Sequence, residues 1–330
     1  LINPLNRLTV SKLIALVIGF ICIFFAYNYN KSATYKISGP IYGTYWKLVS
    51  TEYIPDGLKK SIEDELLRID LIASNYKEDS ELSTINKAAL NQKILISSDM
   101  YSLLSFAENL FEITNGYYDV TLGSLVIENG FGPENTMVEN TIPVSIKRFN
   151  LLSNNALIKN DNFQFDLSSI AKGYAVDKIA QLLIESNRNN FLFDIGGEIV
   201  TNGSKHGAPW LIGIQNPTSI KSQSIMEISS PDFLAVATSG EYRNQTINKK
   251  GDLISHTFVP KTKLSIADKS FSVTVTSDKS AMTADAWATA LNVLGPERGI
   301  RLANENDISV MYIMNDKNIT IKSNSWNYND

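Results

Sequence analysis

Residues 283–297 read TADAWATALNVLGPE and are the most informative stretch of the sequence. The alanines and leucines predict a helix, with Thr283 as its N-cap and Gly295, followed by proline, at its end. Asp285 and Thr289 are four residues apart, so both project from one helix face. A carboxylate and a hydroxyl one turn apart can share an oxygen-loving cation such as Mg²⁺. Equally, Asp285 can simply lie favourably on the helix dipole, with Thr289 as a tolerated polar residue.

A second helix is expected where residues 166–183 read DLSSIAKGYAVDKIAQLL. The polar run from Asp166 to Ser169 can cap it, which places Lys172 in the first turn and Gly173 beside it. A cation there opposes the helix dipole, and glycine lowers helix propensity. A basic side chain beside free N–H groups suits an anion such as phosphate. A solvated surface lysine explains the same residue without any ligand.

The stretch Ser169–Lys172 also matches SxxK, the nucleophile motif of penicillin-binding proteins and β-lactamases. Residues 277–279 (SDK) and 261–263 (KTK) resemble the SDN and KTG elements of those enzymes. Each element has one substituted residue, and their order along the chain is reversed. These departures count against a serine acyl-transfer enzyme.

Several loops carry polar side chains suited to a binding site. Gly196 and Gly197 end a strand-like run directly before Glu198. Glycines there allow close approach of the backbone to a ligand, although a plain tight turn explains the pair equally well. His256 lies beside Ser255 and a proline-containing turn, a setting typical of a site loop. A lone histidine is nevertheless more often structural.

Three tyrosines lie near expected turns. Tyr76 belongs to NYKEDSELSTIN (75–86), and Tyr117 and Tyr118 belong to NGYYDVTLGSLV (115–126). Aromatic rings in such places can stack on a flat ligand, or they can be partly buried packing residues.

From residue 36 to residue 330 the pattern predicts an α+β fold, in one domain of two mixed α/β halves. Strand-like and helical runs alternate irregularly, so repeated βαβ units do not fit. Neither a Walker loop nor a GxGxxG fingerprint occurs. Helical periodicity covers 57–74, 98–114, 170–186, 283–294 and 296–305. Strand-like runs are Tyr45–Ser50, Phe191–Ile195, Trp210–Gln215, Leu234–Thr238, Ser272–Thr276 and Ser309–Met314.

Composition narrows the function classes. The 330 residues are 44% hydrophobic and 19% charged, which excludes a disordered, collagen-like or coiled-coil protein. A net charge of −4 makes nucleic acid a poor candidate partner. Cys22 is the one cysteine, and His206 and His256 are the two histidines, so any metal should be a hard cation bound by oxygen.

Residues 1–35 are expected to be a signal-anchor or a signal peptide. Leu13–Tyr27 is apolar, follows Arg7 and Lys12, and covers roughly 22 Å as a helix, short of a ~30 Å hydrocarbon core. A core helix of the globular domain is the third alternative. An anchor or a signal would place the remaining chain outside the cytoplasm, because the basic residues stay inside.

Several segments together resemble the ApbE-like flavin transferases (FAD:protein FMN transferases), whose members are α+β proteins. The resemblance extends from residue 42 to about residue 313. In family order it includes YGTYWKL (42–48), the two tyrosine segments, DLSSIAKGYAVDK (166–178), FDIGGEIVTNG (193–203), WLIGIQNP (210–217), VATSGEYRN (236–244), SHTFVPKT (255–262) and 272–297. The sequence departs from the family pattern at Val259, where aspartate is usual, and at Ser168-Ser169, where Gly-Gly is common.

The resemblance implies roles for individual residues. Mg²⁺ would be bound by Asp285 and Thr289, with the backbone carbonyls of Ser169 and Ala288. FAD, the substrate, would contact Tyr42, Tyr76, Tyr117, Tyr118, Asp119, Asp166, Lys172 and Phe258. Lys172 and His256 are the expected catalytic residues, with His256 the candidate for proton transfer.

The resemblance also implies a reaction and a location. Family members transfer FMN from FAD to a threonine hydroxyl of a target protein and release AMP, commonly at the outer face of the bacterial cytoplasmic membrane. The expected acceptor is a subunit of a membrane redox complex, and no nucleic acid is expected as a partner. Two alternatives stay open: an Mg²⁺-dependent FAD pyrophosphatase that yields FMN and AMP, and a non-catalytic FAD-binding protein.

Overall fold

The computed structural model describes residues 4–31, 33–132, 148–217, 224–240, 245–247, 253–266, 271–314 and 319–328. The helices are α1 (Pro4–Lys31), α2 (Asp56–Ala73), α3 (Glu81–Lys87), α4 (Ser98–Ile113), α5 (Gly123–Glu128), α6 (Ala171–Glu185), α7 (Ala281–Leu294) and α8 (Pro296–Glu305).

The main sheet has eight strands in the order β1-β2-β6-β7-β12-β15-β16-β17, and all its neighbours are antiparallel. Its strands are β1 (Tyr35–Ile41), β2 (Thr44–Ser50), β6 (Phe191–Ile195), β7 (Glu198–Asn202), β12 (Leu234–Gly240), β15 (Phe271–Ser277), β16 (Ser309–Met314) and β17 (Thr320–Lys322). A three-stranded sheet contains β3 (Lys93–Leu95), β5 (Ala156–Lys159) and β4 (Phe149–Leu152). The remaining strands form the pairs β8 (Ser204–Lys205) with β9 (Ala208–Pro209), β10 (Ile212–Gln215) with β11 (Ser224–Ile228), and β13 (Gln245–Ile247) with β14 (Leu253–Ser255).

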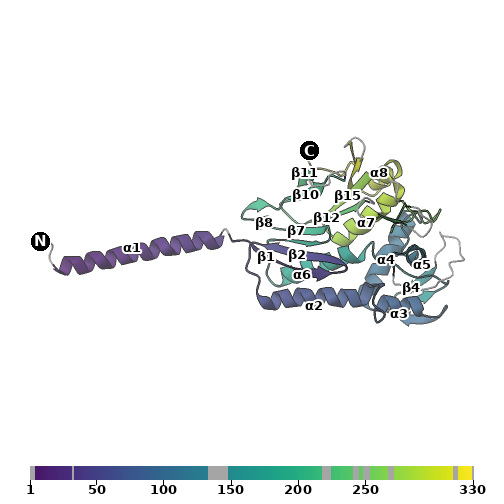
Figure 1. Cartoon of the computed structure of the whole chain (residues 1–330), viewed down its shortest axis with the longest axis horizontal. Helices are drawn as coiled ribbons and strands as arrows, with labels where there is room; N and C mark the ends of the chain where they lie inside the picture. Colours follow the sequence, from purple (N-terminus) through teal and green to yellow (C-terminus); the bar gives the residue numbers. More distant parts are fainter. Residues whose placement is uncertain are drawn as a thin grey trace.

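Both faces of the main sheet are covered. Helices α6 and α7 pack on one face, with α7 against β12 and β15 (Figure 1). The strand period of two sends Ala235 and Ala237 of β12 toward these helices. Leu234 and Val236 point the other way, into a second cluster that includes residues of the β10–β11 hairpin. The sheet is therefore a central layer with a helical layer on one side and a hairpin on the other.

The structure confirms a mixed α/β fold and the elements that periodicity predicts. The five expected helices correspond to α2, α4, α6, α7 and α8, and the six expected strands to β2, β6, β10, β12, β15 and β16. The short helices α3 and α5 were not predicted, because six or seven residues carry too little periodicity to be distinguished from a loop.

Helix α1 leads away from the rest of the chain (Figure 1). Its described apolar side chains are exposed, with Leu13 at 68% and Phe20 at 64%, so they do not form part of the domain core. Within the part of the chain that the structure describes, no helix combines the length and hydropathy needed to cross a membrane.

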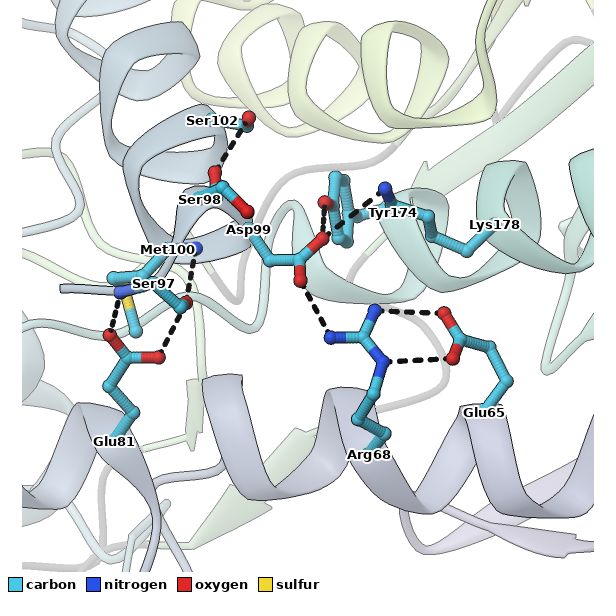
Figure 2. Close-up of polar contacts among 10 residues, drawn as sticks. All are labelled: Glu65, Arg68, Glu81, Ser97, Ser98, Asp99, Met100, Ser102, Tyr174 and Lys178. Atoms are coloured by element: carbon cyan, nitrogen blue, oxygen red, sulfur yellow. Dashed lines mark hydrogen bonds and ion pairs between the residues drawn. The ribbon is translucent and has the colours of Figure 1, made fainter. Parts of the chain in front are cut away.

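The Asp99 carboxylate joins three helices, as Figure 2 shows. From the first turn of α4, it accepts a hydrogen bond from Arg68 Nη1 of α2 at 2.6 Å. On the α6 side, the Tyr174 hydroxyl donates to it and Lys178 Nζ lies 3.2 Å away. Burial alone would raise the pKa of Asp99, but the Arg68, Tyr174 and Lys178 donors lower it to about 2. The ionised carboxylate thus stabilises the packing of α2, α4 and α6.

We expect Asp99→Asn to lower the free energy of unfolding at pH 7 by about 1–2 kcal/mol, since three donors lose a charged acceptor. The folded-state pKa lies below the unfolded value of about 3.9, so this stabilisation is present above pH ~4 and is lost as the pH falls toward 2. Urea unfolding of both proteins across this range measures the difference. Asp64→Asn, which removes the exposed partner of Lys60, is the control and should change stability by less than about 0.5 kcal/mol. An equal effect of the two substitutions would contradict the role of Asp99.

Candidate active site

A cavity of about 240 Å³ brings together most of the predicted site residues. It lies where α6, α7, the β6–β7 turn and the segment after β14 meet. The predicted residues that line it are Tyr117, Tyr118, Asp119, Asp166, Ser169, Lys172, His256, Phe258, Asp285 and Thr289. Gly196, Glu198, Ser239 and Asn292 also line the cavity. From the sequence, Gly196 and Glu198 were placed in a loop suited to a binding site, but none of the four was assigned a role.

Three predicted residues do not line the cavity. Tyr42 donates its hydroxyl hydrogen to the Leu66 carbonyl at 2.8 Å and packs against the core. Tyr76 is 68% exposed and donates to the Phe131 carbonyl at 3.2 Å. Ala288 is fully buried within α7, one residue before Thr289.

Helix α7 places the metal-ligand candidates, but Thr283 is not its cap. The helix begins at Ala281 with Ser280 as N-cap, and the Ser280 hydroxyl accepts the Thr283 N–H at 3.1 Å. The prediction was wrong because Ser280 also bonds Asp177 Oδ2 of α6, at 2.7 Å. Asp177 further accepts the Ala281 N–H at 2.6 Å. A carboxylate distant in sequence therefore fixes where the helix begins.

The side chain of Asp285 is held between the two helices. Its Oδ2 accepts the Gly173 N–H of α6 at 2.9 Å, and the residue is 4% exposed. A Cβ at residue 173 would lie 2.5 Å from the Ala281 carbonyl oxygen and 2.7 Å from Asp285 Cβ. Only glycine fits this contact. Burial raises the pKa of Asp285, against the lowering effects of Lys172 and the Gly173 N–H, so a nearby cation would favour the charged form.

The oxygen donors at this point fit a hard cation. Asp285 and Thr289 lie one turn apart on α7, and both line the cavity rather than the apolar core. Within the described ranges, no group of three or more His, Cys, Asp or Glu side chains is placed to bind a metal. A cation here would therefore depend on hydroxyl, backbone and ligand oxygens in addition to one carboxylate.

Lys172 lies in the first turn of α6, as predicted, but the expected cap is absent. Ile170 occupies the cap position without a side-chain hydrogen bond. Asp166 Oδ1 instead accepts from Ser168 N at 2.9 Å and from Asn75 Nδ2 at 3.0 Å. The prediction failed because α6 begins later than the polar run suggests.

The ammonium group of Lys172 forms an ion pair with Glu198, at 2.6 Å between Nζ and Oε1. Burial by itself would lower the pKa of Lys172, but the carboxylates of Glu198, Asp285 and Asp194 raise it. The hydroxyl of Ser169 bonds the Tyr118 hydroxyl at 3.0 Å. Serine and lysine of the SxxK stretch thus have separate partners, which gives no support to a β-lactamase-like nucleophile.

Glu198 is the residue that the sequence analysis undervalued. It begins β7 directly after a turn in which Gly196 and Gly197 have φ of 61° and 109°. Burial raises the pKa of Glu198, against the lowering effect of Lys172. The glycine pair followed by an acidic residue was a sequence signal, but a plain turn explained it equally well.

The aromatic rim of the cavity carries positive charge. Lys261 Nζ lies 4.4 Å from the centroid of the Tyr117 ring, and Arg298 Nη1 donates to the Tyr117 hydroxyl at 2.6 Å. The His256 ring contacts Phe131 edge-on, with centroids 6.1 Å apart. An anionic ligand with flat rings suits such a surface.

Comparison with known proteins places the chain in a family. The family model described as "ApbE family" matches residues 42–313. The chain belongs to the ApbE family. The resemblance read from the motifs is thereby confirmed.

Curated relatives of this ApbE chain share one name with each other. A protein of Vibrio cholerae, "FAD:protein FMN transferase", is 37% identical over 292 residues, covering 84% of this chain and 86% of the relative. A Haemophilus influenzae protein of that name is 33% identical over 314 residues, covering 88% and 89%. The solved "Flavin Transferase ApbE from Vibrio cholerae" superposes with a TM-score of 0.77 at 33% identity, covering 89% of this chain and 98% of that one.

We expect Gly173→Ala to lower the free energy of unfolding by about 1–3 kcal/mol, because the added methyl overpacks the contact between α6 and α7. The same displacement moves Asp285, so ligand binding in the cavity should weaken as well. Thermal and urea unfolding measure the first effect. Gly57→Ala in α2, where a Cβ meets nothing within 4 Å, is the matched control and should leave stability unchanged or slightly higher.

Proposed function

We propose that this chain transfers FMN from FAD to a threonine hydroxyl of a target protein, with Mg²⁺, and releases AMP. The family and the names of its relatives support flavin transfer. One observation carries the finer proposal: a half-buried ammonium, a buried carboxylate and a hydroxyl line the same cavity, on α6 and α7. This combination suits a diphosphate whose charge must be neutralised before a nucleophile approaches.

The proposed reaction is a displacement at phosphorus. The acceptor oxygen forms a bond to the FMN phosphorus of FAD, while the bond from that phosphorus to the bridging oxygen breaks. AMP leaves with the bridging oxygen, and the threonine proton is transferred to a base. His256, which lines the cavity and is held by a ring contact with Phe131, is the proposed base.

Lys172 supplies positive charge from the protein itself. The residue lines the cavity, and its ammonium group is held there by the ion pair with Glu198. We propose that it contacts the diphosphate. Asp285 and Thr289, with backbone oxygens of Ser169 and Ala288, would bind Mg²⁺, which would neutralise charge on the diphosphate. Tyr117, Tyr118, Asp119, Asp166 and Phe258 are the proposed FAD contacts within the cavity. Tyr42 and Tyr76 lie outside it, so their contacts with FAD would require a ligand that extends beyond the cavity.

The proposed location is the outer face of the cytoplasmic membrane. This proposal rests on the apolar segment Leu13–Tyr27 and the basic residues that precede it. The acceptor would then be an exported domain of a membrane redox complex.

Hydrolysis of FAD and simple FAD storage are the competing functions. Incubation of the purified chain with FAD, Mg²⁺ and an acceptor domain separates the three, followed by mass spectrometry. Flavin attached to the acceptor supports transfer, free FMN plus AMP supports hydrolysis, and unchanged FAD supports storage.

We expect Asp285→Ala to reduce FMN transfer by at least about 100-fold and to abolish its dependence on Mg²⁺. The physical reason is the loss of the carboxylate among the oxygen donors on α7. Transfer rates are measured against Mg²⁺ concentration, with circular dichroism to confirm folding. Asp232→Ala, at an exposed turn, is the control and should behave as wild type. Full activity of Asp285→Ala, or of the wild type in EDTA, would refute the metal assignment.

A further inference from the structure

The two carboxylate oxygens of Glu198 differ, because one has a polar partner and the other has none among the described residues. Oε1 lies 2.6 Å from Lys172 Nζ. Oε2 is buried and has no hydrogen-bond partner among the described residues. The residue is 5% exposed and lines the cavity. A buried carboxylate oxygen without a donor is costly, so the position is suited to a donor that arrives with a ligand.

The local backbone holds this oxygen in place. Glu198 is the first residue of β7 and pairs with Ile195 across the glycine turn. The Gly197 N–H donates to Asp194 Oδ1 at 2.8 Å, and a Cβ at Gly196 would lie 2.9 Å from Thr44 Cγ2. The turn is therefore closely packed against Thr44, and its strand pairing fixes the backbone from which the Glu198 side chain reaches the cavity.

Charge restricts which group can reach Oε2. A phosphate oxygen is an acceptor with negative charge, and a carboxylate repels it. Glu198 also belongs to no group of three or more His, Cys, Asp or Glu side chains, within the described ranges, that could bind a metal. A neutral hydroxyl satisfies the oxygen without adding charge. FAD carries hydroxyls on its ribityl chain and on its ribose, next to the phosphates that Lys172 would contact.

We propose that Glu198 binds FAD directly, accepting a hydrogen bond from a sugar hydroxyl through Oε2 while Oε1 holds Lys172 against the diphosphate. This inference rests on the proposed function in one respect, that FAD is the ligand. It adds a binding role for a residue on β7 that neither the motifs nor the family resemblance assigned. Glu198 orients the cation and recognises the sugar at the same time.

Isothermal titration with FAD in EDTA, without any acceptor, tests the proposal. Glu198→Gln keeps the size of the side chain but removes the charged acceptor, so the Kd for FAD should rise about 10-fold. Glu227→Gln, at an exposed position of β11, is the matched control and should leave the Kd within twofold of wild type. Titrations with FMN and with AMP locate the hydroxyl: weaker FMN binding points to the ribityl chain, and weaker AMP binding points to the ribose.

A Kd for FAD that is unchanged in Glu198→Gln overturns the proposal. That result is also expected if the hydroxyl that Glu198 Oε2 accepts from belongs to the acceptor threonine, because no acceptor is present in the titration. If the wild type fails to bind FAD both in EDTA and with Mg²⁺ present, the proposed function falls together with the role of Glu198. FAD binding without FMN transfer would refute the function but leave the role of Glu198 intact. Thermal unfolding checks each variant. If Glu198→Gln unfolds well below the wild type, Glu198→Asp is titrated instead, because it keeps the charge and withdraws the oxygens by one methylene; it should also weaken FAD binding.

Discussion

The site depends on how closely α6 approaches α7. The absence of a side chain at Gly173 lets the backbone of one helix lie against Ala281 and Asp285 of the other. The Gly173 N–H then holds the Asp285 carboxylate, and Asp177 caps α7 from the same side. Both helices rest on one sheet, so the contact also sets the distance of Lys172 from the metal-ligand candidates. Geometry at the site is thus a product of backbone packing more than of any single polar bond.

The cavity contains more buried negative charge than positive charge. Two buried carboxylates, Glu198 and Asp285, share the influence of one ammonium, that of Lys172. Burial raises the pKa of both acids against the lowering effect of Lys172, and the charge of Asp285 raises the pKa of Glu198 further. An additional cation beside Asp285 would relieve this repulsion and would also attract a diphosphate. The excess of negative charge that destabilises the ligand-free site therefore favours the binding of metal and nucleotide together.

Periodicity predicted the helices and strands well, because the core faces of α2, α4 and α6 are continuous over several turns. It also placed Asp285 and Thr289 on one helix face, which the structure bears out.

The features that the sequence analysis did not predict depend on contacts between segments far apart in the sequence. Ser280 replaces Thr283 as the cap because Asp177 lies beside it, more than a hundred residues earlier in the sequence. The ion pair of Lys172 with Glu198 joins α6 to β7, and no pattern in the sequence around either residue predicts it. The motifs thus identified which residues gather, whereas three-dimensional packing decided which of them touch.

The pairing of β2 with β6 has a consequence for how the chain acquires its structure. Trp46 lies opposite Ile195, so the hairpin β1–β2 has no second neighbour until nearly two hundred residues are available. Such long-range contacts slow folding, because the chain loses the entropy of closing a large loop before the strand pairing that compensates for it can form. During synthesis, the early hairpin would expose an open strand edge to other chains, and a bound chaperone at that stage would protect it from aggregation.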